Sequence, residues 1–500
     1  MSDNYYKTYA GNSWVKENSF IGAKPRASRI PGFAEASKKL PAPFWAGHDS
    51  AVEAYWKAWK IAFANLGKPT GKNGFVADYI DPAFNGHIFM WDSVFMLMFG
   101  KYGLRAFDFQ GALDNFYAKQ HPDGFICREI DETTGGDLFH RFDPASTGPN
   151  LLAWSEWEYF KSTGDVGRLK KVFAALAGFN SWYRTYRTWP DGSYWSSGWG
   201  CGMDNQPRMG REYNPCFSHG RMSWIDATCQ QILNNSVLAR IAETIGRKRE
   251  ASGFRKESDA LSVFVHEKMW DRKTGFYYDR FPGGRLSRVK TIGAFWALFA
   301  GIPENRLARF IKHLENPAEF NRSHRIPTLS ADHPQYDAKG GYWLGAVWAP
   351  TDYMVLRGLD SVGKPDLAFD IAGNHHDNVI KVFEKTGTFW ENYSPEYAMP
   401  GKPAADDFVG WTGLVPITVL LEYIFGLKPD PHAGKLRWEV RLTEEHGVKR
   451  YPFGLRGVMD LRCARRKKPA DRPEISVYSN VPVDIEVRWQ AGKDILRIRR

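Results

Sequence analysis

Apolar residues recur at helical spacing along most of the chain from residue 50 onward, in segments that loops separate. Apolar positions that return every third or fourth residue indicate an amphipathic helix. The pattern predicts twelve helices, which follow one another as six pairs. They are expected at residues 50–66, 90–102, 104–119, 149–163, 166–187, 223–246, 250–270, 289–300, 303–315, 342–359, 363–386 and 407–426.

The two members of each pair differ in polarity. The first members are amphipathic, as in AVEAYWKAWKIAFANL, whereas most second members are apolar on nearly all faces, as in MWDSVFMLMFG. A helix that is apolar all round is a buried one. Six buried helices inside six amphipathic ones predict an all-α fold, an (α/α)6 toroid barrel over residues 50–427. A helical solenoid is the alternative, but it requires a fixed sequence period, and none is visible.

Both ends of the chain depart from the helical pattern. Residues 1–49 are rich in Pro, Gly and aromatic residues without a clear period, which predicts an irregular N-terminal arm. Residues 427–435 are expected to form a linker. Short runs of alternating polar and apolar residues follow, separated by Gly, Pro and Asn, and predict a small β-sheet appendage at 435–500 that packs outside the barrel.

Aromatic residues make up 15% of the chain, with 20 Trp, so rings either fill a large helical core or line a carbohydrate cleft. Composition leaves both readings open. The net charge of +11 is concentrated partly near the C-terminus, in RCARRKKPADR and RIRR. Because Lys and Arg mix with Asp and Glu elsewhere, we expect a solvated surface and no nucleic-acid partner.

The residue types that hold cofactors and metals show no recognisable spacing. Five cysteines without a CxxC predict neither a disulfide framework nor a zinc site. His375 and His376 are adjacent, which is not the spacing of two ligands on one helix face, so we expect them at the surface. No phosphate-binding loop, dinucleotide fingerprint or HExxH occurs, and we expect no cofactor and no metal.

No apolar run approaches the ~20 residues of a membrane span. The opening MSDNYYKTYAGNSW lacks the pattern of a signal peptide. These features predict a cytoplasmic protein without a membrane partner, and a secreted or periplasmic protein whose leader had been removed is the alternative.

The loops that lead into the buried helices carry the candidate chemistry. Asp92 follows Trp91 at a helix start. A carboxylate there is either stabilised by the helix dipole or binds sugar hydroxyls. In SGWGCGMDNQPR, glycines free the backbone around Asp204, and Asn205 and Arg208 are placed to orient or neutralise it. The alternative is a turn with an Asx hydrogen bond.

A second carboxylate lies in TGTFWENYSPEYAMPG. Glu391 follows two aromatic residues, so it is either paired in a salt bridge or used chemically, and Glu396 is its nearby competitor. An Asp and a Glu on separate loops beside an aromatic funnel suit glycoside hydrolysis. One protonates the leaving oxygen, and the other activates water or attacks carbon.

Four stretches together resemble glycoside hydrolase family 63 and, more broadly, the trehalase-like (α/α)6 enzymes. They are MWDS at 90–93, GMDNQPR at 202–208, GGYWLGAVWAP at 340–350 and FWENYSPE at 389–396. The resemblance implies inverting hydrolysis of α-glucosides or α-mannosides, with Asp204 as general acid and Glu391 as general base. Inversion requires the two carboxyls to stand about 6.5–9.5 Å apart.

The resemblance also implies that Asp92 binds sugar hydroxyls and that the Trp-Gly-x-x-Trp stretch lines the cleft. The expected substrate-binding residues are Trp91, Asp92, Asn150, Trp154, Asn205, Arg208, Tyr342, Trp343, Gly345, Trp348, Trp390 and Trp411. Arg141 is a further candidate contact, and Asp226 is as readily a structural helix residue. Cys201 replaces a frequent Ser and Leu344 a frequent Arg, departures that bear on the substrate more than on the reaction.

Other functions fit parts of the pattern. The nearest is a trehalase or a rhamnosidase-like (α/α)6 glycosidase. A non-catalytic carbohydrate-binding protein would lack one of the two carboxylates, and a nucleic-acid-binding scaffold gives no role to Asp204. The expected partner is a small carbohydrate, namely a disaccharide, a glycosyl-glycerate or an oligosaccharide, and the oligomeric state is left open.

Overall fold

The structure is a computed structural model that describes residues 11–26, 29–82 and 85–499. The first ten residues of the predicted arm and the final arginine of the terminal RIRR lie outside the described residues. Within the arm, the chain forms the 3-10 helix η2 (Ser13–Glu17), the short helix α1 (Phe33–Ala36) and the strand β1 (Ala42–Trp45). The arm is therefore irregular for most of its described length.

Each of the twelve predicted helical segments contains a helix. The first members of the pairs are α2 (Asp49–Ala64), α4 (Ala112–Ala118), α6 (Val166–Tyr186), α9 (Lys248–Lys268), α10 (Glu304–Glu315) and α12 (Pro365–Thr386). The second members are α3 (Met90–Gly100), α5 (Leu152–Thr163), α8 (Ile225–Thr244), the 3-10 helix η6 (Ile292–Phe299), α11 (Ala349–Ser361), and the 3-10 turn η7 (Trp411–Leu414), which runs into the π-helix η8 (Val415–Ile424).

Shorter elements lie between these helices. They are α7 (Gly198–Cys201), η3 (Lys101–Gly103), η4 (Phe109–Gly111), η5 (Pro282–Gly284), and three two-stranded ribbons made of β2 (Leu66–Gly67) with β3 (Tyr79–Ile80), β4 (His87–Phe89) with β5 (Glu129–Asp131), and β6 (Trp270–Asp271) with β7 (Phe276–Tyr277). Two predicted boundaries move: α11 begins seven residues later than expected, and the segment 104–119 is divided between η4 and α4.

The second members of the pairs form a closed circuit. α3 contacts α5, which contacts α8, and the contacts continue through η6 and α11 to η7, which returns to α3. Every residue of α3 and of η8 is buried. By contrast, α9 and α10 each bury four residues in a single stripe. The predicted division into buried and amphipathic helices therefore holds for these four helices, whereas α4, expected to be amphipathic, buries six of its seven residues.

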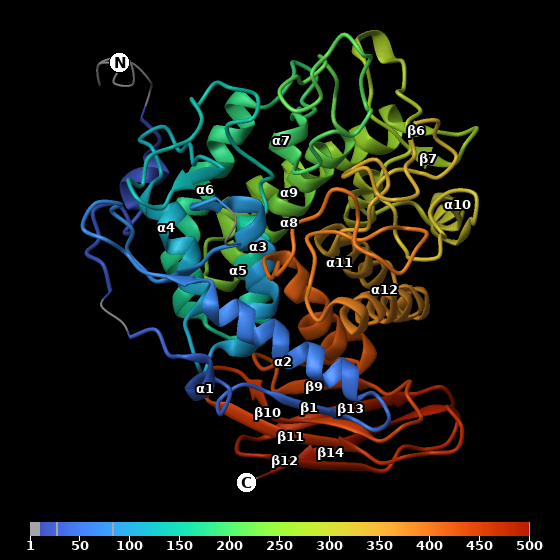
Figure 1. Cartoon of the computed structure of the whole chain (residues 1–500). Helices are drawn as coiled ribbons and strands as arrows, with labels where there is room; N and C mark the ends of the chain where they lie inside the picture. Colours follow the sequence, from blue (N-terminus) through green and yellow to red (C-terminus); the bar gives the residue numbers. More distant parts are fainter. Residues whose placement is uncertain (1–10, 27–28, 83–84, 500) are drawn as a thin grey trace.

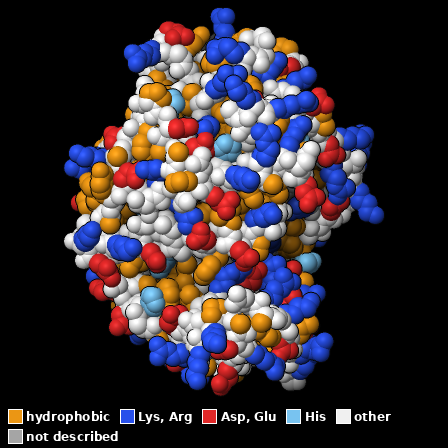
Figure 2. Space-filling view, turned by 90° about the vertical axis from the view of Figure 1, so that its right-hand side faces the viewer, with side chains coloured by type: hydrophobic (Ala, Val, Ile, Leu, Met, Phe, Trp, Pro, Cys, Tyr) orange, Lys and Arg blue, Asp and Glu red, His pale blue; other side chains and the backbone are white. Residues whose placement is uncertain are grey.

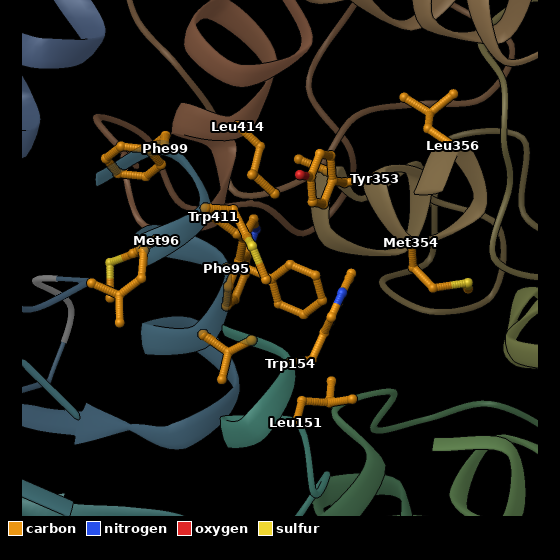
Figure 3. Packing of buried hydrophobic residues seen from close by; sticks show 14 of the residues in the cluster. Phe95, Met96, Phe99, Leu151, Trp154, Tyr353, Met354, Leu356, Trp411 and Leu414 are labelled. Carbon is orange, nitrogen blue, oxygen red and sulfur yellow. The ribbon is translucent and has the colours of Figure 1, made fainter. Parts of the chain in front are cut away.

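Aromatic side chains fill the centre of this circuit. Trp154 on α5 lies edge-on to Phe95 of α3, with ring centroids 6.0 Å apart, and is stacked on Tyr353 of α11 at 6.3 Å. Figure 3 shows these rings and Trp411 converging from four different helices. Much of the high tryptophan content therefore serves packing, because such rings bury large apolar areas.

The C-terminal part consists of strands in two four-stranded sheets. One sheet has the order β1, β10 (His446–Phe453), β11 (Gly457–Cys463), β12 (Ile475–Ser479), and the other has the order β14 (Gly492–Ile498), β13 (Val483–Trp489), β9 (Lys435–Glu439), β8 (Leu427–Asp430). Alternate residues of β11 and β13 are buried, as expected of strands with one covered face. Figure 1 shows these strands below the helices, with α2 running across the boundary.

Two features of this β part differ from the prediction. The segment 427–435, expected to be a linker, begins with strand β8, because Leu427 is buried and pairs with Trp438 of β9. Strand β1 of the arm pairs antiparallel with β10, from Ala42 opposite Lys449 to Trp45 opposite His446. The sheet thus joins segments from both ends of the chain.

The two adjacent histidines of α12 are not at the surface, so that expectation was wrong. His375 and His376 are each 1% exposed. The His324 and His375 rings make a 2.8 Å hydrogen bond, and Asp352 lies 3.2 Å from His375. In the part of the chain that the structure describes, no group of three or more His, Cys, Asp and Glu side chains is arranged to hold a metal ion. No described helix is long and apolar enough to cross a membrane.

Candidate active site

Three carboxylates lie where the loops enter the inner helices. Asp92 is in the first turn of α3, Asp204 follows α7 in the loop that leads to α8, and Glu391 is in the loop between α12 and η7. The charge of Glu391 raises the pKa of both Asp92 and Asp204. The three groups are therefore within electrostatic reach of one another, as the sequence motifs predicted for Asp204 and Glu391.

Two glycines set the position of Asp204. Gly202 ends α7 with φ +74°, and a Cβ there would lie 3.0 Å from the indole of Trp91. At Gly198 a Cβ would lie 2.3 Å from the Asp204 carbonyl oxygen. Only glycine tolerates these two close approaches. The glycine-rich loop therefore folds tightly against Trp91 and brings Asp204 beside the start of α3.

The proton affinity of Asp204 suits a proton donor. Burial raises its pKa to about 7; Arg128 opposes this shift, and the charge of Glu391 adds to it. A carboxyl with a pKa near 7 carries a proton in a substantial fraction of molecules at neutral pH. Asp92 is 4% exposed, burial raises its pKa well above the usual range, and its Oδ1 has no hydrogen-bond partner among the described residues.

Glu391 is held by two hydrogen-bond donors. The Tyr342 hydroxyl donates to its Oε1 at 3.1 Å, and the Ala405 N–H donates to its Oε2 at 3.2 Å. Burial raises the pKa of Glu391, while these two hydrogen bonds act in the opposite direction because they favour the ionised form. The arrangement thus pairs a carboxyl whose pKa is raised to about 7 with a second carboxyl group whose oxygens are fixed in direction by hydrogen bonds.

Asn205 connects the Asp204 loop to the segment that carries Tyr342. Its Nδ2 donates to the Gly341 carbonyl at 3.0 Å, and its Oδ1 accepts from the Trp343 N–H at 2.9 Å. Tyr342, between these two contacts, has φ +65°, a strained conformation for a side chain with a Cβ. The Asn205 side chain therefore helps to hold the strained turn from which Tyr342 reaches Glu391.

A group of aromatic residues backs this site. Trp343 stacks on Trp348 with centroids 4.0 Å apart, Trp348 packs at 5.5 Å from Trp411, and the Trp411 indole donates to the Glu391 carbonyl at 2.8 Å. All three tryptophans are at most 5% exposed. Gly345, with φ +150°, lets the turn pass close to Asp337. These predicted residues lie at the site, where they support Tyr342 and Glu391 from behind.

Arg128 is a site residue that the sequence analysis missed. Its carbonyl accepts from the Met90 N–H at 2.7 Å, which places it beside the start of α3. Its guanidinium is 3.0 Å from Glu129 and lies over the rings of Phe139 and Trp199. It lowers the pKa of Asp92 and of Asp204. The sequence contained a signal for Arg128, because this residue lies in the loop that enters the second buried helix.

Several predicted contacts have other partners in the structure. Arg208 is buried and paired with Asp226 (2.5 Å) and Asp279 (2.6 Å), so it stabilises the fold around α8. The expectation that Arg208 contacts the substrate was therefore wrong. The others are Asn150, which donates to Gln231 (3.0 Å); Trp154, which donates to Glu158 (3.1 Å); Trp390, which donates to Thr386 (3.2 Å); and Arg141, which donates to Asp123 (2.6 Å). Asp226 is accordingly structural.

Residues 86–412 match the sequence profile of the mannosylglycerate hydrolase MGH1-like glycoside hydrolase domain. The chain belongs to glycoside hydrolase family 63. A mannosylglycerate hydrolase from Rubrobacter radiotolerans is 26% identical over 205 residues, which are 39% of this chain and 44% of the relative. The match thus spans less than half of that relative's length.

Solved structures of related fold include two informative neighbours. The family 63 mannosylglycerate hydrolase from Thermus thermophilus, solved in complex with glucose, has a TM-score of 0.58 at 18% identity and covers 73% of this chain and 99% of its own. A family 78 rhamnosidase from a Bacillus species has a TM-score of 0.64 at 13% identity and covers 90% of this chain and 42% of its own. The second likeness extends beyond the helices, and both concern the fold alone.

The surface charge of this family 63 member is mixed. Figure 2 shows Lys and Arg side chains interspersed with Asp and Glu over one face, without a continuous patch of one sign. Many cations are also paired, such as Arg462 with Glu445 and Arg499 with Asp484 near the C-terminus. The excess of positive charge is therefore partly neutralised where the sequence concentrates it.

Proposed function

We propose that the protein hydrolyses an α-glycosidic bond, of a glucoside or a mannoside, with inversion at the anomeric carbon. The closed circuit of second helices supports a complete (α/α)6 barrel over residues 50–427. The two sheets beside it combine strand β1 of the arm with the strands from Leu427 onward. The catalytic end is the one where the loops enter the inner helices.

Asp204 is the general acid of this mechanism and Glu391 the general base. Asp204 donates its proton to the glycosidic oxygen as the bond to the anomeric carbon breaks. Glu391 takes a proton from a water molecule that attacks the opposite face of the sugar. The observation that carries the proposal is the placement of Asp204 in a loop entering an inner helix together with a glutamate whose two oxygens are fixed by Tyr342 and Ala405. The raised pKa of Asp204, about 7, agrees with this role.

Asp92 and Trp91 hold the sugar at the cleavage point. The partnerless Oδ1 of Asp92 is buried, and a buried acceptor without a donor is costly. A sugar hydroxyl supplies that donor. The leaving group lies on the side of Asp204, where Trp199 packs against the exposed Phe217 with centroids 4.5 Å apart. This ring pair suits a second sugar or another small carbohydrate partner as the leaving group.

The test is proton NMR of product anomers during hydrolysis of a panel of α-glycosides: trehalose, kojibiose, nigerose, maltose, glucosylglycerate and mannosylglycerate. We expect the β-anomer first. Asp204→Asn and Glu391→Gln should each lower kcat by about 10²–10⁴-fold, because each removes a proton-transfer step.

Glu396→Gln is the matched control, since Glu396 is nearby but is occupied by Arg322 and Tyr336. It should retain activity. For glucosylglycerate and mannosylglycerate, whose leaving group has no anomeric centre, an α-anomer as the first product would contradict inversion. Full activity in either Asp204→Asn or Glu391→Gln would contradict the assigned roles.

A further inference from the structure

A second pocket lies at the far ends of the inner helices. It has a volume of about 670 Å³ and is lined by residues of α5, α8, η6, α11 and η8 together with β8 and β9. Pockets of roughly 300–1,000 Å³ are typical of small-molecule sites. Lys101, which lines it, directly follows α3, nine residues beyond Asp92 and about 14 Å away at 1.5 Å per residue. Neither Asp92, Asp204 nor Glu391 lines the pocket. The pocket is therefore separate from the candidate active site.

The lining residues carry more positive than negative charge. Six are Lys or Arg and four are Asp or Glu. Ion pairs join Lys101 to Glu422 (2.7 Å), Lys161 to Glu158 (2.6 Å) and Lys428 to Asp360 (2.7 Å). Three of the four acids in the pocket are thus engaged by cations, and the fourth, Asp430, accepts from the Ala433 N–H at 3.1 Å.

Two cationic groups remain available to a ligand. Arg240 on α8 is exposed and has no ion-pair partner among the described residues. The Nε of Arg357 is buried and lacks a hydrogen-bond partner within the described chain. Lys161, whose side chain is 35% exposed, shares the Glu158 carboxylate with Arg357, so these two cations are opposed there by one negative charge. These donors surround one volume but come from three different helices.

The lowered pKa of Lys161 agrees with an excess of positive charge in the pocket. Burial and the neighbouring Arg357 lower its pKa to about 8, although Glu158 opposes the change. Cations at helix C-termini are favoured by the helix dipole, which explains why Lys and Arg gather at this end. The dipole does not explain why a volume of this size stays open among them, or why two tryptophans, Trp154 and Trp157, form part of its wall.

We propose that this pocket binds a small organic anion that carries carboxylate or phosphate groups. Arg240 and Lys161 contact the anionic group from α8 and α5, and the two tryptophans face the apolar part of the ligand. Arginine and lysine make strong charge-assisted hydrogen bonds to both kinds of group. The site is independent of the proposed glycosidase mechanism.

The test uses the full chain and two probes, sodium phosphate and sodium malonate, measured by thermal shift and isothermal titration calorimetry. Sodium chloride at equal ionic strength controls for screening. We expect one or both probes to raise the Tm saturably. Arg240→Gln and Lys161→Gln should each weaken binding about tenfold, because each removes one charged hydrogen bond.

Arg249→Gln is the matched control, because Arg249 is an exposed cation on α9 outside the pocket. It should bind like the parent. Binding of phosphate alone identifies a phosphoryl ligand, and binding of malonate alone a carboxylate. The proposal is overturned if neither probe acts beyond sodium chloride, or if Arg240→Gln and Lys161→Gln bind as well as Arg249→Gln. Because Arg240 is exposed, its variant is expected to fold.

Discussion

The pKa of Asp204 is set by opposing influences. Burial and the charge of Glu391 raise its pKa, and Arg128 lowers it. Arg128 itself is held by Glu129 and by the rings of Phe139 and Trp199, so its charge is fixed in place. Arg128 therefore influences the pKa of the proposed general acid without being assigned a part in the proposed proton transfer.

Replacing Arg128 by Met should shift the pH dependence of hydrolysis. The acid must be protonated to act, so kcat/KM falls as pH rises through the pKa of Asp204, at about 7 in the parent. Removal of the nearby positive charge disfavours the ionised carboxylate, so this limb should move upward by about one pH unit. A kcat/KM profile from pH 5 to 9 measures the shift.

The conservative variant Arg128→Lys keeps the charge and should leave the limb near its parental position. A limb that stays fixed in Arg128→Met, or that moves downward, would show that Arg128 acts on Asp204 in some other way.

The position of a single site residue was predictable where both its residue type and its loop, one that enters a buried helix, indicated a functional role. Asp204 is a carboxylate among glycines, and Glu391 is a carboxylate that follows two aromatic residues. The structure places Asp204 and Glu391 within electrostatic reach of each other. Arg208 was assigned to the substrate because it followed Asp204, but Asp279, 71 residues further along the chain, completes its ion pairs. A sequence read locally does not reveal such a distant partner.

At the scale of elements, the turn at 340–345 depends on the loop that carries Asp204. Asn205→Ala removes both of its hydrogen bonds to that turn and frees Tyr342 from its strained conformation. Tyr342 then no longer fixes Glu391, so kcat should fall about 10–100-fold with a smaller change in KM. Steady-state kinetics of the variant give both constants.

Asn205→Asp keeps the acceptor for the Trp343 N–H but loses the donor to Gly341, and it should retain part of the activity. Equal losses of kcat in the two variants, or a loss confined to KM, would speak against a positioning role.

The helix boundaries show which local features periodicity omits. The apolar residues at 342–348 predicted a helix, but Tyr342 has a positive φ and Trp343 stacks on Trp348, so they form a turn behind Glu391. Likewise η6 is a 3-10 helix and η8 a π-helix. Burial on all faces was foreseen, whereas the hydrogen-bond pattern was not, because apolar spacing reports which face is covered and not how tightly the backbone winds.

Over the whole molecule, the β strands are tied to the helices by contacts on both sides of the boundary. Tyr102 beyond α3 donates to Glu422 of η8 at 2.8 Å and packs 5.9 Å from Tyr451 of β10. Arg450 donates to the Leu40 carbonyl at 3.1 Å. The appendage foreseen from its alternating pattern is thus an integral part of the fold, which the sequence did not reveal.

We therefore expect helices and strands to unfold together. Calorimetry should give one transition, coincident with the transitions seen by far-ultraviolet circular dichroism and tryptophan fluorescence. An earlier, separate transition of the β part would show that these contacts contribute little.

The pairing of β1 with β10 also has a consequence for synthesis. The two strands are about 400 residues apart in the chain. At the ribosomal rate of about 5–20 residues per second, β1 waits about 20–80 seconds for its partner to emerge. During that interval Trp45, which is 7% exposed in the finished protein, lacks its cover. The nascent chain therefore carries β1 as an unpaired strand for most of its elongation, and is a candidate client of ribosome-associated chaperones.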